Sequence, residues 1–169
     1  MTASSLTFCL DVDGVMTDGT FWYDHTGKLL KRFGPEDADA LQIMRAFLQI
    51  RFVSADKRGF PISEARIARD MGFDLELVAS EDRYAWLEQE IGLDSTIYMG
   101  DSFKDAVIIR DCMLGIAPAN ASPVARQIAD HVTVSRGGQG AVAEACFFLN
   151  TFLGLQVPEF ELGNLGEIR

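Results

Sequence analysis

The stretch FCLDVDGVMTDG, residues 8–19, joins an apolar strand to a cluster of acids. Its first three residues are apolar, and Asp11 and Asp13 then follow with one residue between them. Gly14 lets the chain turn away directly afterwards. Carboxylates at the edge of a core are costly unless they have partners. The stretch therefore predicts a buried strand over Thr7–Val12 whose carboxyl end carries functional acids.

Short apolar segments alternate with helical ones along the rest of the chain, with a β-hairpin expected at 19–33. This alternation is typical of βαβ units. It predicts an α/β fold of three layers, a Rossmann-like parallel sheet with helices on both faces and no separate cap domain. We expect one domain over 1–155 and a tail over 156–169. Further strands are expected over 49–55, 75–78, 95–101, 114–117 and 131–134, and helices over 35–47, 61–71, 83–91, 103–111, 123–129 and 140–153.

Composition limits the function classes. The 169-residue chain carries a formal net charge of −10, which argues against binding to a nucleic-acid backbone. Its three cysteines are widely spaced and form no disulfide or zinc pattern, which fits a reducing compartment. We find neither a signal-peptide pattern nor an apolar run that could cross a membrane. The expected setting is the cytoplasm, without a membrane or nucleic-acid partner.

Three of the predicted strands end in reactive groups. The first ends at Asp11 and Asp13, the second at Ser54 and a later one at Asp101. Parallel sheets place their ligands at this edge, where the strand order reverses. A cluster of carboxylates favours a hard divalent cation such as Mg²⁺. With the metal, one aspartate can attack phosphorus and its neighbour can transfer protons, while a hydroxyl and a cation hold the phosphoryl group.

The motifs in this order resemble those of the haloacid dehalogenase-like phosphatases. DVDGVMTDG looks like motif I, FVSA like motif II and YMGDSFKDA like motif IV. The hairpin and RGGQGAVAE narrow the resemblance to the capless branch typified by 3-deoxy-manno-octulosonate 8-phosphate phosphatase. The resemblance extends from Phe8 to about Leu153. It implies the haloacid dehalogenase fold with the hairpin in place of a cap.

The resemblance also implies roles for individual residues. Asp11 matches the nucleophile and Asp13 the general acid and base. Mg²⁺ would be held by Asp11, the backbone carbonyl of Asp13 and Asp101, with Asp105 supporting these ligands. Phosphate would be bound by Ser54, Ala55 and Arg83, and substrate by Asp56, Lys57, Gly138 and Gln139.

The implied activity is a Mg²⁺-dependent phosphatase that works through an aspartyl-phosphate. Its substrate would be a small phosphorylated sugar or sugar acid, similar to an octulosonate 8-phosphate or a nonulosonate 9-phosphate of cell-surface glycan synthesis. Relatives of this branch form tetramers whose hairpins meet, so that a neighbouring subunit closes the site. The alternative is a weak or inactive domain kept for oligomerisation or regulation, as in the C-terminal domain of CMP-sialate synthetases.

Three departures from the branch pattern leave alternatives open. Arg83 stands where lysine is usual, and it could instead be an exposed residue at a helix start, with Lys57, Arg58 or Lys104 supplying the cation. Asp56 replaces an arginine or glutamate, and Gln139 an arginine, so the sugar-contacting residues diverge. Asp105 could simply favour a helix start, and Ser54 could be a plain strand-end hydroxyl. The glycine run at 137–140 could be a flexible turn or could offer N–H groups to a ligand.

Overall fold

Six parallel strands form the centre of the fold in the order β5-β4-β1-β6-β7-β8. A computed structural model describes residues 6–160. β1 lies between β4 and β6, so the strand order reverses beside it. This is the position at which a parallel sheet forms its ligand site. The strands are β1 (Thr7–Asp11), β4 (Gln49–Ser54), β5 (Asp74–Leu77), β6 (Thr96–Met99), β7 (Leu114–Ala117) and β8 (His131–Val132).

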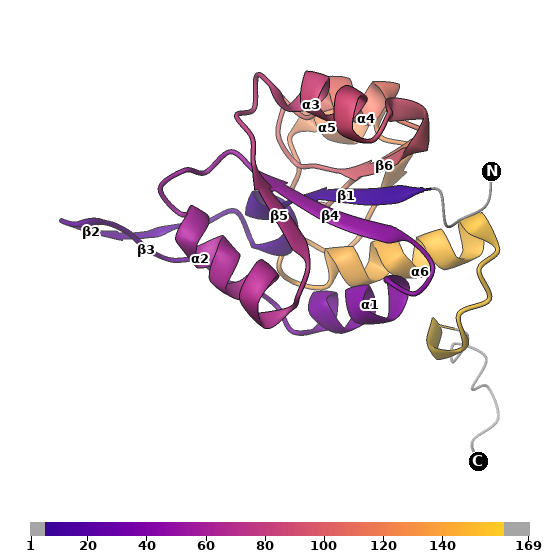
Figure 1. The fold of residues 1–169 in the computed structure, drawn as a ribbon, viewed down its shortest axis with the longest axis horizontal. Coiled ribbons are helices and arrows are strands. Elements are labelled where there is room, and N and C mark those ends of the chain that lie inside the picture. The colour runs from indigo at the N-terminus through magenta and orange to yellow at the C-terminus, as the bar shows by residue number, and fades with distance from the viewer. Residues whose placement is uncertain (1–5, 161–169) are drawn as a thin grey trace, which may run out of the picture.

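Helices cover both faces of the sheet (Figure 1). One face packs against α1, α2 with its π-helical continuation η3, and α6, and the other against α3, α4 and α5. β1 shows why both faces are covered: Phe8 and Leu10 belong to the first apolar cluster and Cys9 to the second. The helices are α1 (Glu36–Met44), α2 (Phe60–Glu64), η3 (Ala65–Asp70), α3 (Arg83–Glu90), η4 (Leu93–Ser95), α4 (Ala106–Asp111), α5 (Pro123–Ile128) and α6 (Ala141–Leu153).

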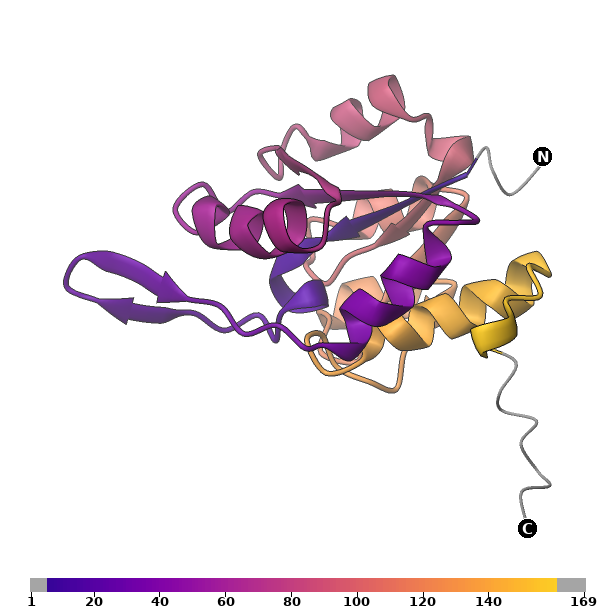
Figure 2. The same ribbon diagram turned by 60° about the horizontal axis from the view of Figure 1, so that its bottom comes forward.

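A two-stranded hairpin of β2 (Trp22–Asp24) and β3 (Gly27–Leu30) projects from the body of the molecule (Figures 1 and 2). It follows the turn η2 (Val12–Met16) at the end of β1. The expected hairpin is confirmed, and its second strand begins at Gly27, with only two residues between the strands. The reason is a tight turn, in which the Asp24 carboxylate accepts hydrogen bonds from residues 26 and 27.

The alternation of strands and helices is as predicted, with differences at element ends. The expected helix over 103–111 begins only at Ala106, because residues 102–105 form a turn that the Asp105 carboxylate closes by accepting from the Ser102 N–H. None of the helices within 6–160 is long and apolar enough to cross a membrane. The boundary at residue 155 stays a prediction, and residues 161–169 of the expected tail lie outside the described part. Val157, at the start of that tail, is fully buried.

Candidate active site

The sheet brings the predicted strand-end residues to one edge. Asp11 is the last residue of β1, Ser54 the last of β4, and Asp101 follows β6 by two positions. β1 is hydrogen-bonded to both β4 and β6, so these three ends are neighbours. The edge therefore gathers the acids and the hydroxyl that the sequence singled out.

Asp11 is held in place from two sides. Its carboxylate accepts a hydrogen bond of 2.8 Å from the Val12 N–H and lies 3.1 Å from the Arg83 guanidinium. Burial raises the pKa of Asp11 to about 7, with the Asp105 charge adding to the rise and Arg83 opposing it. These two contacts fix the orientation of the Asp11 carboxylate.

Arg83, the first residue of α3, points into the protein. Only 3% of the residue is exposed, so the alternative left open by the sequence, an exposed arginine at the helix start, is wrong. Its guanidinium lies 2.8 Å from the Asp105 carboxylate and 2.9 Å from the Tyr98 hydroxyl, in addition to Asp11. The burial has a physical cause: the carboxylates of Asp11, at the end of β1, and of Asp105, in the turn before α4, need a counter-charge, and Arg83 supplies it.

Asp105 is fully engaged by protein donors. One carboxylate oxygen accepts from Tyr98 and Arg83, and the other accepts from the N–H and hydroxyl of Ser102. It is 1% exposed. A role limited to favouring a helix start does not describe this contact set, because Asp105 joins β6, α3 and the turn before α4.

The acids form a candidate site for a cation. Ligand atoms of Asp11, Asp101 and Asp105 lie within 4.8 Å of one another. Burial, and then the neighbouring charges of Asp11 and Asp105, raise the pKa of Asp101 to about 7. Oxygen ligands under mutual repulsion suit a hard divalent ion such as Mg²⁺. Because Asp105 is satisfied by protein donors, Asp11 and Asp101 are better placed to bind the ion directly.

Gly14 leaves room for Asp101. Its φ is +90°, and a Cβ there would lie 2.1 Å from an Asp101 carboxylate oxygen. We expect Gly14→Ala to lower stability by about 1–3 kcal/mol because it combines this clash with a strained backbone. It should also weaken Mg²⁺ binding, measured by calorimetry. Gly27→Ala in the hairpin turn, also at positive φ but with open space around it, is the matched control and should leave Mg²⁺ binding unchanged. Equal metal affinity in both variants would contradict this placement.

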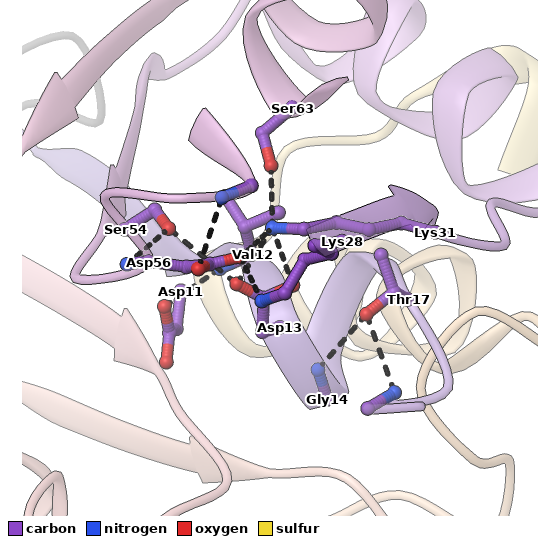
Figure 3. A network of polar contacts seen from close by, with 12 residues as sticks. Asp11, Val12, Asp13, Gly14, Thr17, Lys28, Lys31, Ser54, Asp56 and Ser63 are labelled. Carbon is purple, nitrogen blue, oxygen red and sulfur yellow. Dashed lines mark hydrogen bonds and ion pairs between the residues drawn. The ribbon is translucent and has the colours of Figure 1, made fainter. Parts of the chain in front are cut away.

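Lys31, the residue directly after the hairpin, binds the Asp13 carboxylate (Figure 3). Its ammonium lies 2.8 Å from the Asp13 carboxylate and donates to the Ser63 hydroxyl at 2.8 Å. The buried Ser54 hydroxyl donates to Asp13 at 3.5 Å. Lys31 and Ser54 thus hold the Asp13 carboxylate in place. Sequence reasoning missed Lys31, although two adjacent cations directly after the apolar pair Leu29 and Leu30 were a usable signal.

Lys28 and Lys31 both bind the Asp56 carboxylate, at 2.5 and 2.8 Å. The Gly59 N–H donates to its other oxygen. These contacts join the hairpin to the loop after β4. Lys28 is a second residue that sequence reasoning did not single out.

The Asp56 contacts predict a pH dependence of stability. Burial raises the pKa of Asp56, but the two lysines outweigh it and lower that pKa to about 2. A depressed folded-state pKa means that the stabilisation is complete above the unfolded value of about 3.9 and is lost as the pH falls towards about 2. Urea unfolding should show a difference between wild type and Asp56→Asn that shrinks between about pH 6 and pH 3. If the difference in the free energy of unfolding stayed constant over this pH range, that result would refute the ion pairs of Asp56 with Lys28 and Lys31.

A pocket of about 330 Å³ opens beside these groups. Of the predicted substrate and phosphate residues, Ala55, Asp56 and Arg83 line it. Ser54, which is fully buried, and Lys57, which is exposed, are not among the lining residues. The lining residues are Asp11, Asp13, Phe21, Lys28, Ala55, Asp56, Ser80, Arg83, Asp101, Ser102, Phe103 and Lys104.

Gly138 and Gln139 line a different pocket, together with residues 32–36. Their backbone N–H groups are already used, since Gly138 donates to Val15 and Gln139 to Arg136. The loop packs on the turn after β1 so closely that a Cβ at Gly137 would lie 2.0 Å from the Gly14 carbonyl oxygen. Within this chain the glycine run supports the turn that carries Asp13 rather than offering N–H groups to a ligand.

Known proteins are similar to this chain in both sequence and fold. Residues 84–145 match the sequence model of the haloacid dehalogenase-like hydrolases. The 3-deoxy-D-manno-octulosonate 8-phosphate phosphatase of Haemophilus influenzae is 34% identical over 140 residues, covering 79% of this chain and 76% of the relative. The Escherichia coli K12 enzyme of the same name is 30% identical over 147 residues, covering 83% and 76%. The chain belongs to this phosphatase family of haloacid dehalogenase-like hydrolases.

Solved structures agree with this family. The cobalt-bound 3-deoxy-D-manno-octulosonate 8-phosphate phosphatase of H. influenzae aligns with a TM-score of 0.79 and 28% identity, covering 96% of this chain and 99% of that chain. A probable phosphatase from Pseudomonas syringae aligns with a TM-score of 0.81 and 27% identity, covering 98% and 96%. The family, the fold class and the phosphatase class predicted from the motifs are confirmed.

Proposed function

We propose that this member of the phosphatase family hydrolyses a phosphate monoester of a small sugar or sugar acid, with Mg²⁺ as cofactor and an aspartyl-phosphate on Asp11. The named substrate of the relatives, an octulosonate 8-phosphate, indicates the class. The observation that carries the proposal is the placement of Asp11 at the end of β1, fixed by Val12 and Arg83 and next to Asp101. This arrangement would supply a nucleophile, a cation and metal ligands to a bound phosphoryl group.

In the first step, an Asp11 carboxylate oxygen attacks phosphorus while the bond from phosphorus to the sugar oxygen breaks. Asp13 lies in the same pocket and gives its proton to the leaving oxygen. Lys31 and Ser54 hold the Asp13 side chain for this transfer. The products of this step are the free alcohol and phosphorylated Asp11.

In the second step, Asp13 takes a proton from water, and the water oxygen attacks the phosphorus on Asp11. The bond to Asp11 breaks, which releases inorganic phosphate and restores the carboxylate. Arg83 and Ser54 would offset the charge of the phosphoryl oxygens, with Ala55 beside them in the loop. The Arg83 side chain reaches the pocket even though most of it is buried.

Mg²⁺ fits the acids present. Asp11 and Asp101, with the backbone carbonyl of Asp13, would hold it, and Asp105 would keep Arg83 in place. When bound, the ion neutralises the carboxylates and the phosphate. The cobalt-bound form of the H. influenzae relative supports a divalent ion as cofactor.

Phosphate release from a panel of sugar phosphates tests the proposal. We expect turnover of at least one member with Mg²⁺ and no turnover after chelation by EDTA. The inactive alternative, a domain kept for oligomerisation or regulation, predicts no release from any member. That outcome would overturn the enzyme assignment for this chain.

The hairpin further supports a proposed homotetramer in which neighbouring subunits close the site. Trp22 and Leu30 face each other across the hairpin and are 64% and 59% exposed. Exposed apolar side chains on a projecting element favour burial against another copy.

We expect sedimentation to show a tetramer for the wild type and a monomer for the double variant Trp22→Asp, Leu30→Asp. Val134→Asp, which changes an exposed valine outside the hairpin, should remain tetrameric. A monomeric wild type would refute the assembly.

We also propose a reducing setting such as the cytoplasm. Cys9, Cys112 and Cys146 are all buried with free thiols. Burial raises the pKa of the Cys9 thiol to about 12, so this side chain is inert and belongs to the core.

A further inference from the structure

The cations of the active-site pocket are already paired within the protein. Four carboxylates and three cationic side chains line it. Arg83 is used by Asp11 and Asp105, and Lys28 is used by Asp56. Lys104, the third cation, is half-exposed and lies 4.0 Å from Glu81. In the described part of the chain, no buried cation of this pocket is left for a second anionic group on the substrate.

We propose that Asp56 selects against alcohols that carry a carboxylate, so that the enzyme prefers phosphate esters of uncharged sugars or polyols. This inference rests on the proposed function, because it concerns the leaving alcohol of the same reaction. It narrows the substrate class of sugars and sugar acids to the uncharged members.

Asp56 cannot easily turn away from a bound alcohol. Its backbone N–H donates to the Ser54 hydroxyl at 3.1 Å, which fixes the loop beside the phosphate position. One carboxylate oxygen accepts from the Gly59 N–H, and the other is bound by Lys28 and Lys31. A carboxylate on the incoming alcohol would meet the like charge of Asp56, and it would have to displace Asp56 to reach either lysine.

The pocket also offers surfaces suited to an uncharged sugar. Phe21 from the hairpin segment and Phe103 from the turn after β6 both line it, and Phe103 is 70% exposed. Lys28 lies 3.3 Å from the centre of the Phe21 ring, which holds that ring beside the pocket. Aromatic rings in a pocket pack against the apolar faces of a ligand, while a few polar groups orient its hydroxyls.

A matched substrate pair tests the inference. Sorbitol 6-phosphate and 6-phosphogluconate differ only at the far carbon, which is a hydroxymethyl group in one and a carboxylate in the other. We expect the wild-type kcat/KM for sorbitol 6-phosphate to exceed that for 6-phosphogluconate by about tenfold or more. A wild-type preference for 6-phosphogluconate, or for 3-deoxy-manno-octulosonate 8-phosphate over sorbitol 6-phosphate, would overturn the inference.

Two variants should shift this ratio in opposite directions. Asp56→Asn releases Lys28 and should lower the preference for the uncharged substrate by about fivefold or more, while Lys28→Met should raise it. Asp74→Asn, an exposed acid at the opposite edge of the sheet, makes the same change in net charge and should leave the ratio unchanged. A ratio that Asp56→Asn does not change, or that Asp74→Asn changes equally, would also overturn it.

The failure of the inference is distinguishable from the failure of the proposed function. Hydrolysis of p-nitrophenyl phosphate that needs both Mg²⁺ and Asp11 measures the phosphatase chemistry without a sugar. If that hydrolysis occurs and the carboxylated sugar is preferred, the inference alone fails. If no phosphate ester is hydrolysed, the proposed function fails, and the inference fails too because it rests on that function.

Discussion

Replacing Asp11 by Asn is expected to lower phosphate release from any accepted substrate by at least about a thousandfold. The variant keeps the size of the side chain and the hydrogen bond from the Val12 N–H. It loses the nucleophilic oxygen and one metal-binding charge. Steady-state release of inorganic phosphate, measured with saturating Mg²⁺, gives the comparison.

Asp18→Asn is the matched control for Asp11→Asn. Asp18 belongs to the same motif but bonds to Thr20 at the base of the hairpin and is not among the lining residues. We expect it to retain activity within about a fewfold of wild type. Phosphate release that persists in Asp11→Asn would show that another group attacks phosphorus.

Replacing Arg83 by Met is expected to lower the free energy of unfolding by about 3 kcal/mol or more. The substitution leaves Asp11 and Asp105 buried without their shared counter-charge. Urea unfolding in EDTA measures the loss, and Mg²⁺ should recover part of it by binding the folded acids. Activity should fall as well, since Arg83 lines the pocket.

Arg83→Lys separates the charge from the guanidinium. We expect it to recover most of the stability and only part of the activity, because lysine cannot contact Asp11, Asp105 and Tyr98 with the same geometry. Arg110→Met, at an exposed ion pair with Asp111, should leave the free energy of unfolding nearly unchanged. If Arg83→Met lowered the free energy of unfolding as little as Arg110→Met does, that result would contradict the buried ion pairs of Arg83.

The fold could be predicted from the sequence because the signals that mark its strands and helices lie within or directly beside those elements. Alternating strands and helices, and acids placed directly after apolar strands, indicate a parallel sheet and its ligand edge. The order of β4, β1 and β6 then brings Ser54, Asp11 and Asp101 together, as expected. Element ends were less predictable, since tertiary contacts decide them: the carboxylate of Asp105 closes a turn where helix was expected.

The charge pairing of the site could not be predicted from the sequence. Lys28 and Lys31 lie in a hairpin segment far along the chain from Asp56, and only the folded contact shows that they share its carboxylate. From the sequence, Arg83 could be a phosphate ligand or an exposed residue at a helix start. Its burial depends on the acids of β1 and of the turn before α4. The role of the glycine run also needed the structure, because its packing on Gly14 is a contact between distant segments.

Trapping the covalent intermediate tests the central claim most directly. In Asp13→Asn, attack by Asp11 on p-nitrophenyl phosphate needs no proton donor, but the water that must follow has no base. Acid-quenched protein should therefore carry one phosphoryl group, which peptide mass spectrometry should place on Asp11. Phosphate release without any phosphorylated protein, or a phosphoryl group on another residue, would contradict the assignment of Asp11 as the nucleophile.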